Sequence, residues 1–325
     1  MSSLDGALLR ALRSSEIHQT GGELARLLQA TPQVISETVA GLRDAGFEID
    51  ERPTLGYRLL AAPDRLIAAD LRARLGDTLF VREILVFEET DSTNERLMQL
   101  GAAGALGGLV LFAEHQSAGR GRFSREWASA SHKGLWFSLI LRPDLPLAHW
   151  PRLTAWAAVA VADAVEQSTG LTVGIKWPND LELNHLKVAG ILIETATDAA
   201  GQSFAVVGIG LNVNHESEDF PAALRNSATS IRIASRRILD RPSLAAEVLR
   251  SLAQWYPRLT ADFSGLLGEA RRRSTLLGRK VALQTPGERI EGVAEDLAED
   301  GRLILRLPDG RRETVSAGEA SVIRE

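Results

Sequence analysis

The stretch Gln116–Trp127 reads Q-S-A-G-R-G-R-F-S-R-E-W and lies between two apolar, strand-like runs, 108–113 and 134–141. Glycines let the backbone adopt unusual torsions and approach a ligand closely, and arginines carry forked donors that match carboxylate or phosphate oxygens. The residues concerned are Gly119, Gly121, Arg120, Arg122 and Arg125. The stretch predicts a loop that closes over an anionic ligand, because the ligand would offset the repulsion between the arginines. A solvated basic surface loop is the alternative.

The composition of the chain excludes several classes of protein. A length of 325 residues allows two or three domains, and 45% hydrophobic with 24% charged residues is ordinary for a globular protein. The net charge of -5 gives no support to a general nucleic-acid or membrane-surface binder. With no cysteine and six scattered histidines, the sequence predicts no disulfide, no thiol nucleophile and no metal held by protein side chains. It shows neither a signal peptide nor a membrane span, which predicts a cytoplasmic protein.

Residues 1–62 have the pattern of a separate module with three helices followed by a short hairpin. This order is typical of a winged helix-turn-helix, whose third helix enters the major groove and would present Gln33, Ser36 and Glu37 to DNA. Residues 1–60 contain six arginines, no lysine and eight acidic residues, so acids outnumber bases by two. Because DNA affinity depends largely on neutralising phosphates, the charge favours packing or protein contacts as strongly as DNA recognition.

The rest of the chain predicts an α+β protein with two further domains. In residues 65–270, neighbouring β-runs such as 181–183 and 187–194 indicate a mixed or mainly antiparallel sheet with helices, including a helix over 243–260. In residues 275–325, short alternating segments separated by Pro-Gly and Asp-Gly turns predict a small β-barrel.

Two further motifs carry polar chemistry. Asp91–Glu95 reads D-S-T-N-E at a predicted helix start, where Ser92 and Glu95 would form a capping box. The same hydroxyls, amide and helix-terminal N–H groups are also suited to binding a polar head group. The stretch 176–180, K-W-P-N-D, is either a simple turn between two strands or a rigid turn that carries site residues. Lys187 on its own would usually be a solvated lysine. Gly208 and Gly210 lack the third glycine of a dinucleotide fingerprint, and there is no Walker loop.

Taken in order, five motifs resemble those of the bacterial biotin protein ligases. They are D-S-T-N at 91–94, Q-S-A-G-R-G-R-x-x-R-x-W at 116–127, K-W-P-N-D-L at 176–181, K-V-A-G-I-L-I-E at 187–194 and G-I-G-L-N-V-N at 208–214. With the N-terminal module, the chain resembles the bifunctional type, which also represses biotin-synthesis genes. The resemblance implies a class II synthetase-like catalytic domain and an SH3-like C-terminal barrel. It also implies ATP and biotin as substrates, Mg²⁺, a biotin carboxyl carrier protein and operator DNA as partners, and homodimerisation on ligand binding.

The resemblance also assigns residues to roles. The biotin-binding positions would be Ser92, Thr93, Asn94, Gln116, Arg120, Gly121, Arg122 and Lys187. The nucleotide-binding positions would be Trp127, Asn212, Arg122 and Arg125. The catalytic positions would be Arg122, Lys187, Arg125 and Asp180. The loop departs from the commonest family pattern, G-R-G-R-x-G-R, because Ser124 replaces its third glycine and Phe123 stands where a basic residue is frequent. These changes would stiffen the loop and affect retention of the intermediate.

Two alternatives remain open at this point. One is a ligand-sensing transcriptional regulator without ligase activity, against which the intact arginine loop and Lys187 argue. The other is a ligase for a related acyl group such as lipoate on the same central fold. Detection of adenylate formation would distinguish a ligase from the regulator without ligase activity. Competition between biotin and lipoate would distinguish a biotin ligase from a lipoate ligase.

Overall fold

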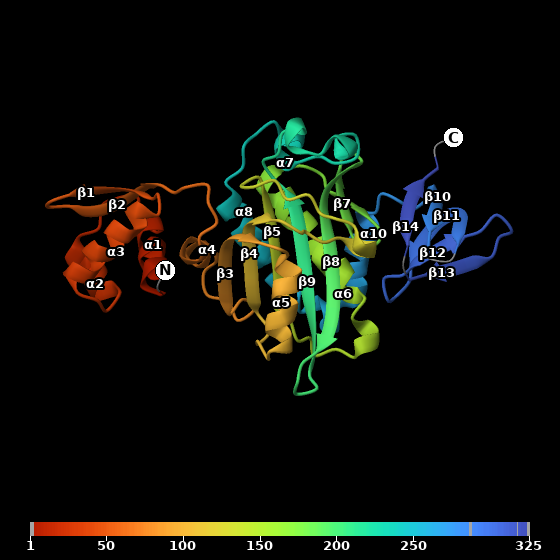
Figure 1. Cartoon of the computed structure of the whole chain (residues 1–325), viewed down its shortest axis with the longest axis horizontal. Helices are drawn as coiled ribbons and strands as arrows, with labels where there is room; N and C mark the ends of the chain where they lie inside the picture. Colours follow the sequence, from red (N-terminus) through yellow and green to blue (C-terminus); the bar gives the residue numbers. More distant parts are fainter. Residues whose placement is uncertain (1–2, 286–287, 317, 324–325) are drawn as a thin grey trace.

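The computed structural model describes residues 3–285, 288–316 and 318–323. The predicted Pro286-Gly287 turn lies outside these ranges. The N-terminal module has three helices and a two-stranded antiparallel hairpin (Figure 1). Its elements are α1 (Ser3–Arg13), α2 (Gly21–Leu27), α3 (Pro32–Asp44), β1 (Glu48–Arg52) and β2 (Gly56–Ala61). Thr20 and Glu23 form a capping box on α2, and Thr31 caps α3 before Pro32, as its sequence predicts.

A seven-stranded sheet forms the centre of the molecule, with the strand order β3-β4-β5-β9-β8-β7-β6. Only the β3–β4 pair is parallel, so the prediction of a mainly antiparallel mixed sheet is confirmed. The strands are β3 (Glu83–Thr90), β4 (Leu109–Gln116), β5 (Gly134–Leu141), β6 (Gly174–Lys176), β7 (Asp180–Leu183), β8 (Leu186–Thr197) and β9 (Ser203–Asn212).

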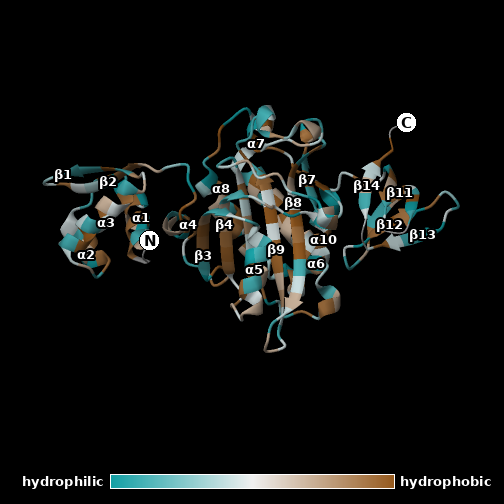
Figure 2. Cartoon of the chain, viewed as in Figure 1, coloured by the Kyte–Doolittle hydropathy of each residue, from teal (hydrophilic) through white to brown (hydrophobic). Residues whose placement is uncertain are grey.

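Helices cover both faces of this sheet. Helix α5 (Thr93–Ala102) lies on one face, and α6 (Arg152–Thr169) and α8 (Arg241–Trp255) lie on the other (Figure 1). Along β4, Val110 and Phe112 join the large core under α6, while Leu109 and Leu111 face the smaller core under α5. A strand buried on both faces should be apolar along its whole length, and the central strands are mostly hydrophobic in Figure 2. Every residue of β5 is buried.

The C-terminal module is a five-stranded antiparallel sheet with the order β13-β12-β11-β10-β14. It lies at the end of the molecule opposite the N-terminal module (Figure 1). Its strands are β10 (Lys280–Gln284), β11 (Arg289–Leu297), β12 (Leu303–Arg306), β13 (Arg312–Val315) and β14 (Glu319–Val322). The sequence predicts the first four strands and misses β14, which pairs with β10 and brings Glu319 to the catalytic domain.

Three helical segments differ from the sequence predictions. Helix α4 (Ala68–Leu75) and the short helix α7 (Ile231–Ser235) are not predicted, and α10 (Phe263–Arg272) is the last helix of the catalytic domain in the described residues. The predicted helix over 243–260 is wrong in its bounds, because α8 ends at Trp255 and a separate short helix, α9 (Arg258–Ala261), follows. Pro257 accounts for the break, since proline has no N–H and its ring clashes with the carbonyl four residues earlier.

Helix α4 joins the N-terminal module to the catalytic domain. Asp70 of α4 is 1% exposed and lies 2.6 Å from Arg13 of α1 and 2.7 Å from Arg74 of α4 itself. Arg74 also lies 2.9 Å from Asp240, the residue that caps α8. A buried carboxylate needs paired partners, so these contacts fix α4 between α1 and α8.

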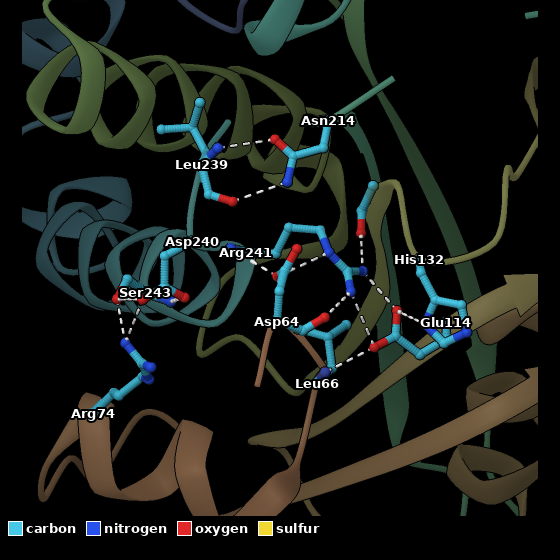
Figure 3. A network of polar contacts seen from close by, with 11 residues as sticks. Asp64, Leu66, Arg74, Glu114, His132, Asn214, Leu239, Asp240, Arg241 and Ser243 are labelled. Carbon is cyan, nitrogen blue, oxygen red and sulfur yellow. Dashed lines mark hydrogen bonds and ion pairs between the residues drawn. The ribbon is translucent and has the colours of Figure 1, made fainter. Parts of the chain in front are cut away.

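A buried ion pair holds the linker around Asp64, which connects the N-terminal module to the catalytic domain (Figure 3). Arg241 is fully buried and lies 2.6 Å from Glu114 of β4, which is 1% exposed. Arg241 also donates to the side chain and carbonyl of Asp64 and to the carbonyl of Gly134 at the start of β5. Glu114 accepts in addition from the backbone N–H of Leu66, at 2.7 Å. Asp64 and Leu66 are therefore linked through Arg241 and Glu114 to β4 and β5, the strands before and after the arginine-rich loop (residues 116–127).

Among the described residues, no helix is long and apolar enough to cross a membrane.

Candidate active site

Three glycines create a flat floor on the α5 side of the sheet. Gly190 on β8 is paired with Gly210 on β9, and Gly208 lies two residues earlier on β9. A Cβ on Gly208 would lie 2.1 Å from Asn94 Oδ1, and a Cβ on Gly210 would lie 2.5 Å from Trp127 Cε2. The glycines therefore allow side chains from α5 and from the arginine-rich loop to lie directly on the sheet. The sequence shows the pair Gly208 and Gly210 but not this function for it.

A polar network connects the start of α5 to this floor. Thr93 donates to Gln116 Oε1 through its N–H at 2.8 Å and through its hydroxyl at 3.1 Å. The buried Ser138 hydroxyl lies 2.7 Å from Thr93 Oγ1 and donates to Asn94 Oδ1 at 2.6 Å. Asn94 Nδ2 donates to Glu194 Oε2 at 2.9 Å. The structure thus brings together Thr93, Asn94 and Gln116, whose sequence positions span the helix start and the loop.

The predicted capping box of α5 is wrong. Ser92 is the N-cap residue and is buried, but its side chain makes no capping hydrogen bond. Glu95, the other predicted member, accepts a charge-assisted bond from Arg120 at 2.6 Å. Gln116 satisfies the N–H of Thr93 instead. A guanidinium forms a stronger bond to a carboxylate than a backbone amide does, so Glu95 turns away from the helix end.

The loop arginines are paired with protein groups and point in different directions. Arg120 lies between Glu95 and Glu194, at 2.6 and 3.0 Å. Arg122 donates to Asn179 Oδ1 at 3.0 Å and to the carbonyl of Gly318 at 3.4 Å. Burial lowers the pKa of the Arg122 guanidinium from its usual value, and the nearby Asp180 carboxylate opposes that shift. The predicted repulsion between the arginines is therefore already offset by protein acceptors in this structure.

The middle of the loop is strained and is held from the C-terminal module. Arg125 forms a two-pronged ion pair with Glu319 of β14, with one bond of 2.8 Å. The hydrogen bond and charge of Glu319 raise the pKa of Arg125. Phe123 and Ser124 have φ values of 56° and 58°, in the left-handed region that favours glycine. This strain explains physically why glycine suits position 124 in the commoner loop pattern.

Lys187 lies at the centre of the cationic side of the site. Its ammonium is 2.7 Å from Asp180 Oδ1 and 5.2 Å from the centroid of the Trp127 ring. Asn179 Nδ2 donates to the carbonyl of Ile191 on β8 at 2.9 Å, which fixes the K-W-P-N-D turn beside Lys187. The structure therefore brings Asp180, Lys187 and Trp127 into contact, as expected of a joint site.

A cluster of rings extends the site beyond Trp127. Trp136 lies edge-on to Trp127 at 6.1 Å and to His215 at 5.6 Å, and His215 stacks on Phe220 at 4.9 Å. Burial lowers the pKa of His215 to about 4, so its ring is neutral. Within the described chain, Trp127 Nε1 and both ring nitrogens of His215 are buried without a hydrogen-bond partner. Asn212, at 4% exposure, donates to the carbonyl of Thr229 at 3.0 Å.

The predicted DNA-reading residues lie on α3 in the distant N-terminal module (Figure 1), where Gln33 donates to Glu37 at 2.9 Å. Ser138, Glu194 and His215 lie among the candidate site residues and are not predicted from the sequence. Ser138 had a signal, because it is the single polar side chain in the apolar run 134–141. No group of three or more His, Asp or Glu side chains in the described ranges could hold a metal ion.

Comparison with known proteins places the chain in a family. Residues 86–214 match the model of the biotin/lipoate A/B protein ligase family, and residues 276–322 match the biotin protein ligase C-terminal domain. The chain is 32% identical over 299 residues to the bifunctional ligase/repressor BirA of Bacillus spizizenii, covering 92% of each protein. The chain belongs to the biotin protein ligase family.

Two other relatives agree with this placement. The biotin–[acetyl-CoA-carboxylase] ligase of Mycobacterium tuberculosis is 37% identical over 256 residues, which covers 75% of this chain and 90% of that protein. A solved structure of the biotin protein ligase from Aquifex aeolicus in complex with biotin and ATP superposes with a TM-score of 0.64 at 28% identity. It covers 74% of this chain and 99% of that chain. The catalytic fold of this chain is thus the biotin ligase fold, with a C-terminal sheet domain.

Proposed function

We infer that this chain is an ATP-dependent biotin–protein ligase, which activates biotin as biotinyl-5′-AMP and transfers it to a lysine of a biotin carboxyl carrier protein. One observation carries the assignment beyond family membership. The glycine floor of Gly190, Gly208 and Gly210 has uncharged amide and hydroxyl groups on one side (the neutral side), which Glu194 supports through Asn94, and a cationic group around Lys187 on the other. Biotin has a neutral ureido ring at one end and a carboxylate at the other, which matches this division.

We assign the neutral side to the biotin ring. Thr93, Asn94 and Gln116 carry amide and hydroxyl groups at hydrogen-bonding distance from one another, and Ser92 is buried beside them. Such groups can exchange their mutual bonds for bonds to a ureido ring. Arg120 and Gly121 are assigned to the loop that covers the ligand, as the resemblance implies.

We assign the cationic side to adenylate formation. In the first step the biotin carboxylate attacks the α-phosphorus of ATP, and pyrophosphate leaves. Arg122, Arg125 and Lys187 would stabilise the negative charge that develops on the phosphoryl oxygens. To do so, Arg122 would leave Asn179, and Lys187 would exchange Asp180 for the ligand. Trp127 and Asn212 are assigned to the nucleotide, which the ring cluster beside them supports.

In the second step the ε-amine of the carrier lysine attacks the carbonyl of the mixed anhydride, and AMP leaves. We assign Asp180 to orienting or deprotonating this amine. The loop over 116–127 would exclude water between the two steps, because the anhydride otherwise hydrolyses. Mg²⁺ would enter this reaction as the companion of ATP, where it would offset the negative charge of the phosphates.

The assignment favours biotin over lipoate, the other acyl group in the description of the matching family. A dithiolane ring has no donor and only weakly accepting sulfurs, so it could not replace the bonds that Thr93 and Asn94 make in the protein, whereas a ureido ring could. A competition assay with both acids separates the two specificities.

The test combines purified protein, ATP, Mg²⁺, biotin and a carboxyl-carrier domain, followed by mass measurement of the carrier. The expected result is a mass increase of one biotinyl group that requires both ATP and biotin. Arg122→Ala should lower the rate by about 10²–10³, as expected for one transition-state donor. An unchanged carrier mass would leave the alternative of a ligand-sensing regulator without ligase activity.

We propose domains at 1–62, 65–270 and 275–325, with a winged helix-turn-helix first and an SH3-like barrel last.

A second candidate role is transcriptional repression by the N-terminal module. The name of the Bacillus relative, ligase/repressor, supports a DNA role, but Arg43, the basic residue of α3, donates to the carbonyl of Ile49 in the hairpin. A gel shift on candidate promoter DNA, with and without biotin and ATP, tests repression. Sedimentation under the same conditions tests ligand-dependent homodimerisation.

A further inference from the structure

Glu194 on β8 is bonded to two elements that border the proposed biotin site. Its Oε2 accepts from Asn94 Nδ2 on α5 at 2.9 Å, and its Oε1 accepts from Arg120 on the arginine-rich loop at 3.0 Å. The two partners are 100 and 74 residues away from it in the sequence. The side chain of Glu194 is 24% exposed, so water screens these bonds only in part.

The carboxylate fixes which way the Asn94 amide points. Ser138 donates to Asn94 Oδ1, and the ionised Glu194 can only accept, so it must face Asn94 Nδ2. Gly208 lets the Asn94 amide lie directly on the sheet, since a Cβ at position 208 would lie 2.1 Å from Asn94 Oδ1. A glutamine at position 194 would have the same shape but would carry both a donor and an acceptor, so it would no longer enforce this orientation.

We propose that Glu194 is a positioning residue for biotin binding, which sets the orientation of the Asn94 amide and the resting position of Arg120. The proposal rests on the proposed ligase function and deepens it. Glu194 lies on a central strand of the sheet, whereas Asn94 and Arg120 lie on a helix start and a loop. The strand therefore provides the rigid reference to which both ligand-contacting groups are held.

Glu95 provides a matched comparison within the same network. It also pairs with Arg120, at 2.6 Å, but it is 42% exposed and, in the part of the chain that the structure describes, has no hydrogen bond to Asn94. Glu194→Gln disturbs both partners, while Glu95→Gln disturbs only Arg120. Glu291, which pairs with Arg289 on the distant C-terminal module, is a surface control for loss of one carboxylate.

The experiment measures steady-state biotinylation of a carrier domain by wild type, Glu194→Gln, Glu95→Gln and Glu291→Gln. We expect Glu194→Gln to raise KM for biotin about tenfold with kcat within about twofold of wild type, because bonds to the charged group are lost before the reaction starts. We expect Glu95→Gln to raise KM less than about threefold, and Glu291→Gln to match wild type. A purely structural role would lower the active fraction, and hence kcat, while leaving KM unchanged.

Three results would overturn the proposal. They are an unchanged KM in Glu194→Gln, equal KM increases in Glu194→Gln and Glu95→Gln, or a fall in kcat alone. If Glu194→Gln melts well below wild type, Glu194→Asp, which keeps the acceptor-only charge, is expected to recover part of the KM increase, and no recovery would contradict the proposal. Wild type that fails to label the carrier at all would instead refute the ligase assignment, so the two failures are distinguishable.

Discussion

Replacing Arg241 by methionine tests the buried ion pair that joins the linker to the catalytic domain. Arg241 is fully buried, and its guanidinium donates to Asp64, Glu114 and the carbonyl of Gly134 (Figure 3). Methionine fills much of the space but donates nothing. Glu114, at 1% exposure, would then keep only the N–H of Leu66 and a more distant contact with His132, at 3.4 Å.

The expected loss follows from leaving a buried charge without its main partner. Removing one member of a buried pair typically destabilises a protein by about 3–5 kcal/mol. Because Leu66 still donates to Glu114, we expect Arg241→Met to lower the free energy of unfolding by about 3 kcal/mol. Urea unfolding followed by tryptophan fluorescence suits the measurement, since all six tryptophans lie between residues 127 and 255 and report on the catalytic domain.

The double variant Arg241→Met with Glu114→Gln separates charge from packing. Glutamine is neutral and still offers an oxygen to the Leu66 N–H, so we expect the double variant to recover at least half of the loss. A loss below about 1 kcal/mol in Arg241→Met would refute the argument that this pair is buried and essential. A double variant no more stable than Arg241→Met would refute the argument from charge.

Three further predictions concern the site. His215 has a pKa of about 4 in the folded protein against 6.5 as its ordinary value. Because folding favours the neutral ring, the free energy of unfolding is highest above pH 6.5 and falls as the pH drops toward 4. In His215→Leu, up to about 3 kcal/mol of this decrease should be absent from the unfolding curves. Gly210→Ala places a Cβ 2.5 Å from Trp127 Cε2 and should reduce adenylate formation at least about tenfold, while Gly268→Ala, with no atom within 4 Å, should not. Ser124→Val puts a β-branched residue at φ 58°, should destabilise the loop by about 1–2 kcal/mol, and should speed release of free adenylate measured without carrier.

The sequence predicts elements whose local signals agree with their surroundings. Thr31 and Pro32 mark the start of α3, and the pairing over 181–194 follows from short apolar runs joined by a tight turn. Helix α4 lacks such signals, because Ile67 makes no side-chain cap and the helix is stabilised by α1 and α8. Its existence depends on tertiary contacts that no local pattern contains.

The candidate site is divided in the same way. Arg122 and Lys187 could be named as candidates because their motifs are recognisable along the chain. The capping box of Ser92 and Glu95 could not be judged locally, since Arg120, 25 residues later, competes for Glu95. His215 carries no local signal at all, because its burial depends on Trp136 and Phe220 folding around it.

A crystal structure with biotin and ATP bound tests the proposed ligand site most directly. We expect biotin against Gly208 and Gly210, with Arg122 moved from Asn179 to the ligand oxygens and residues 116–127 covering the ligands. Ligands bound elsewhere, with Arg122 still 3.0 Å from Asn179 Oδ1, would contradict it.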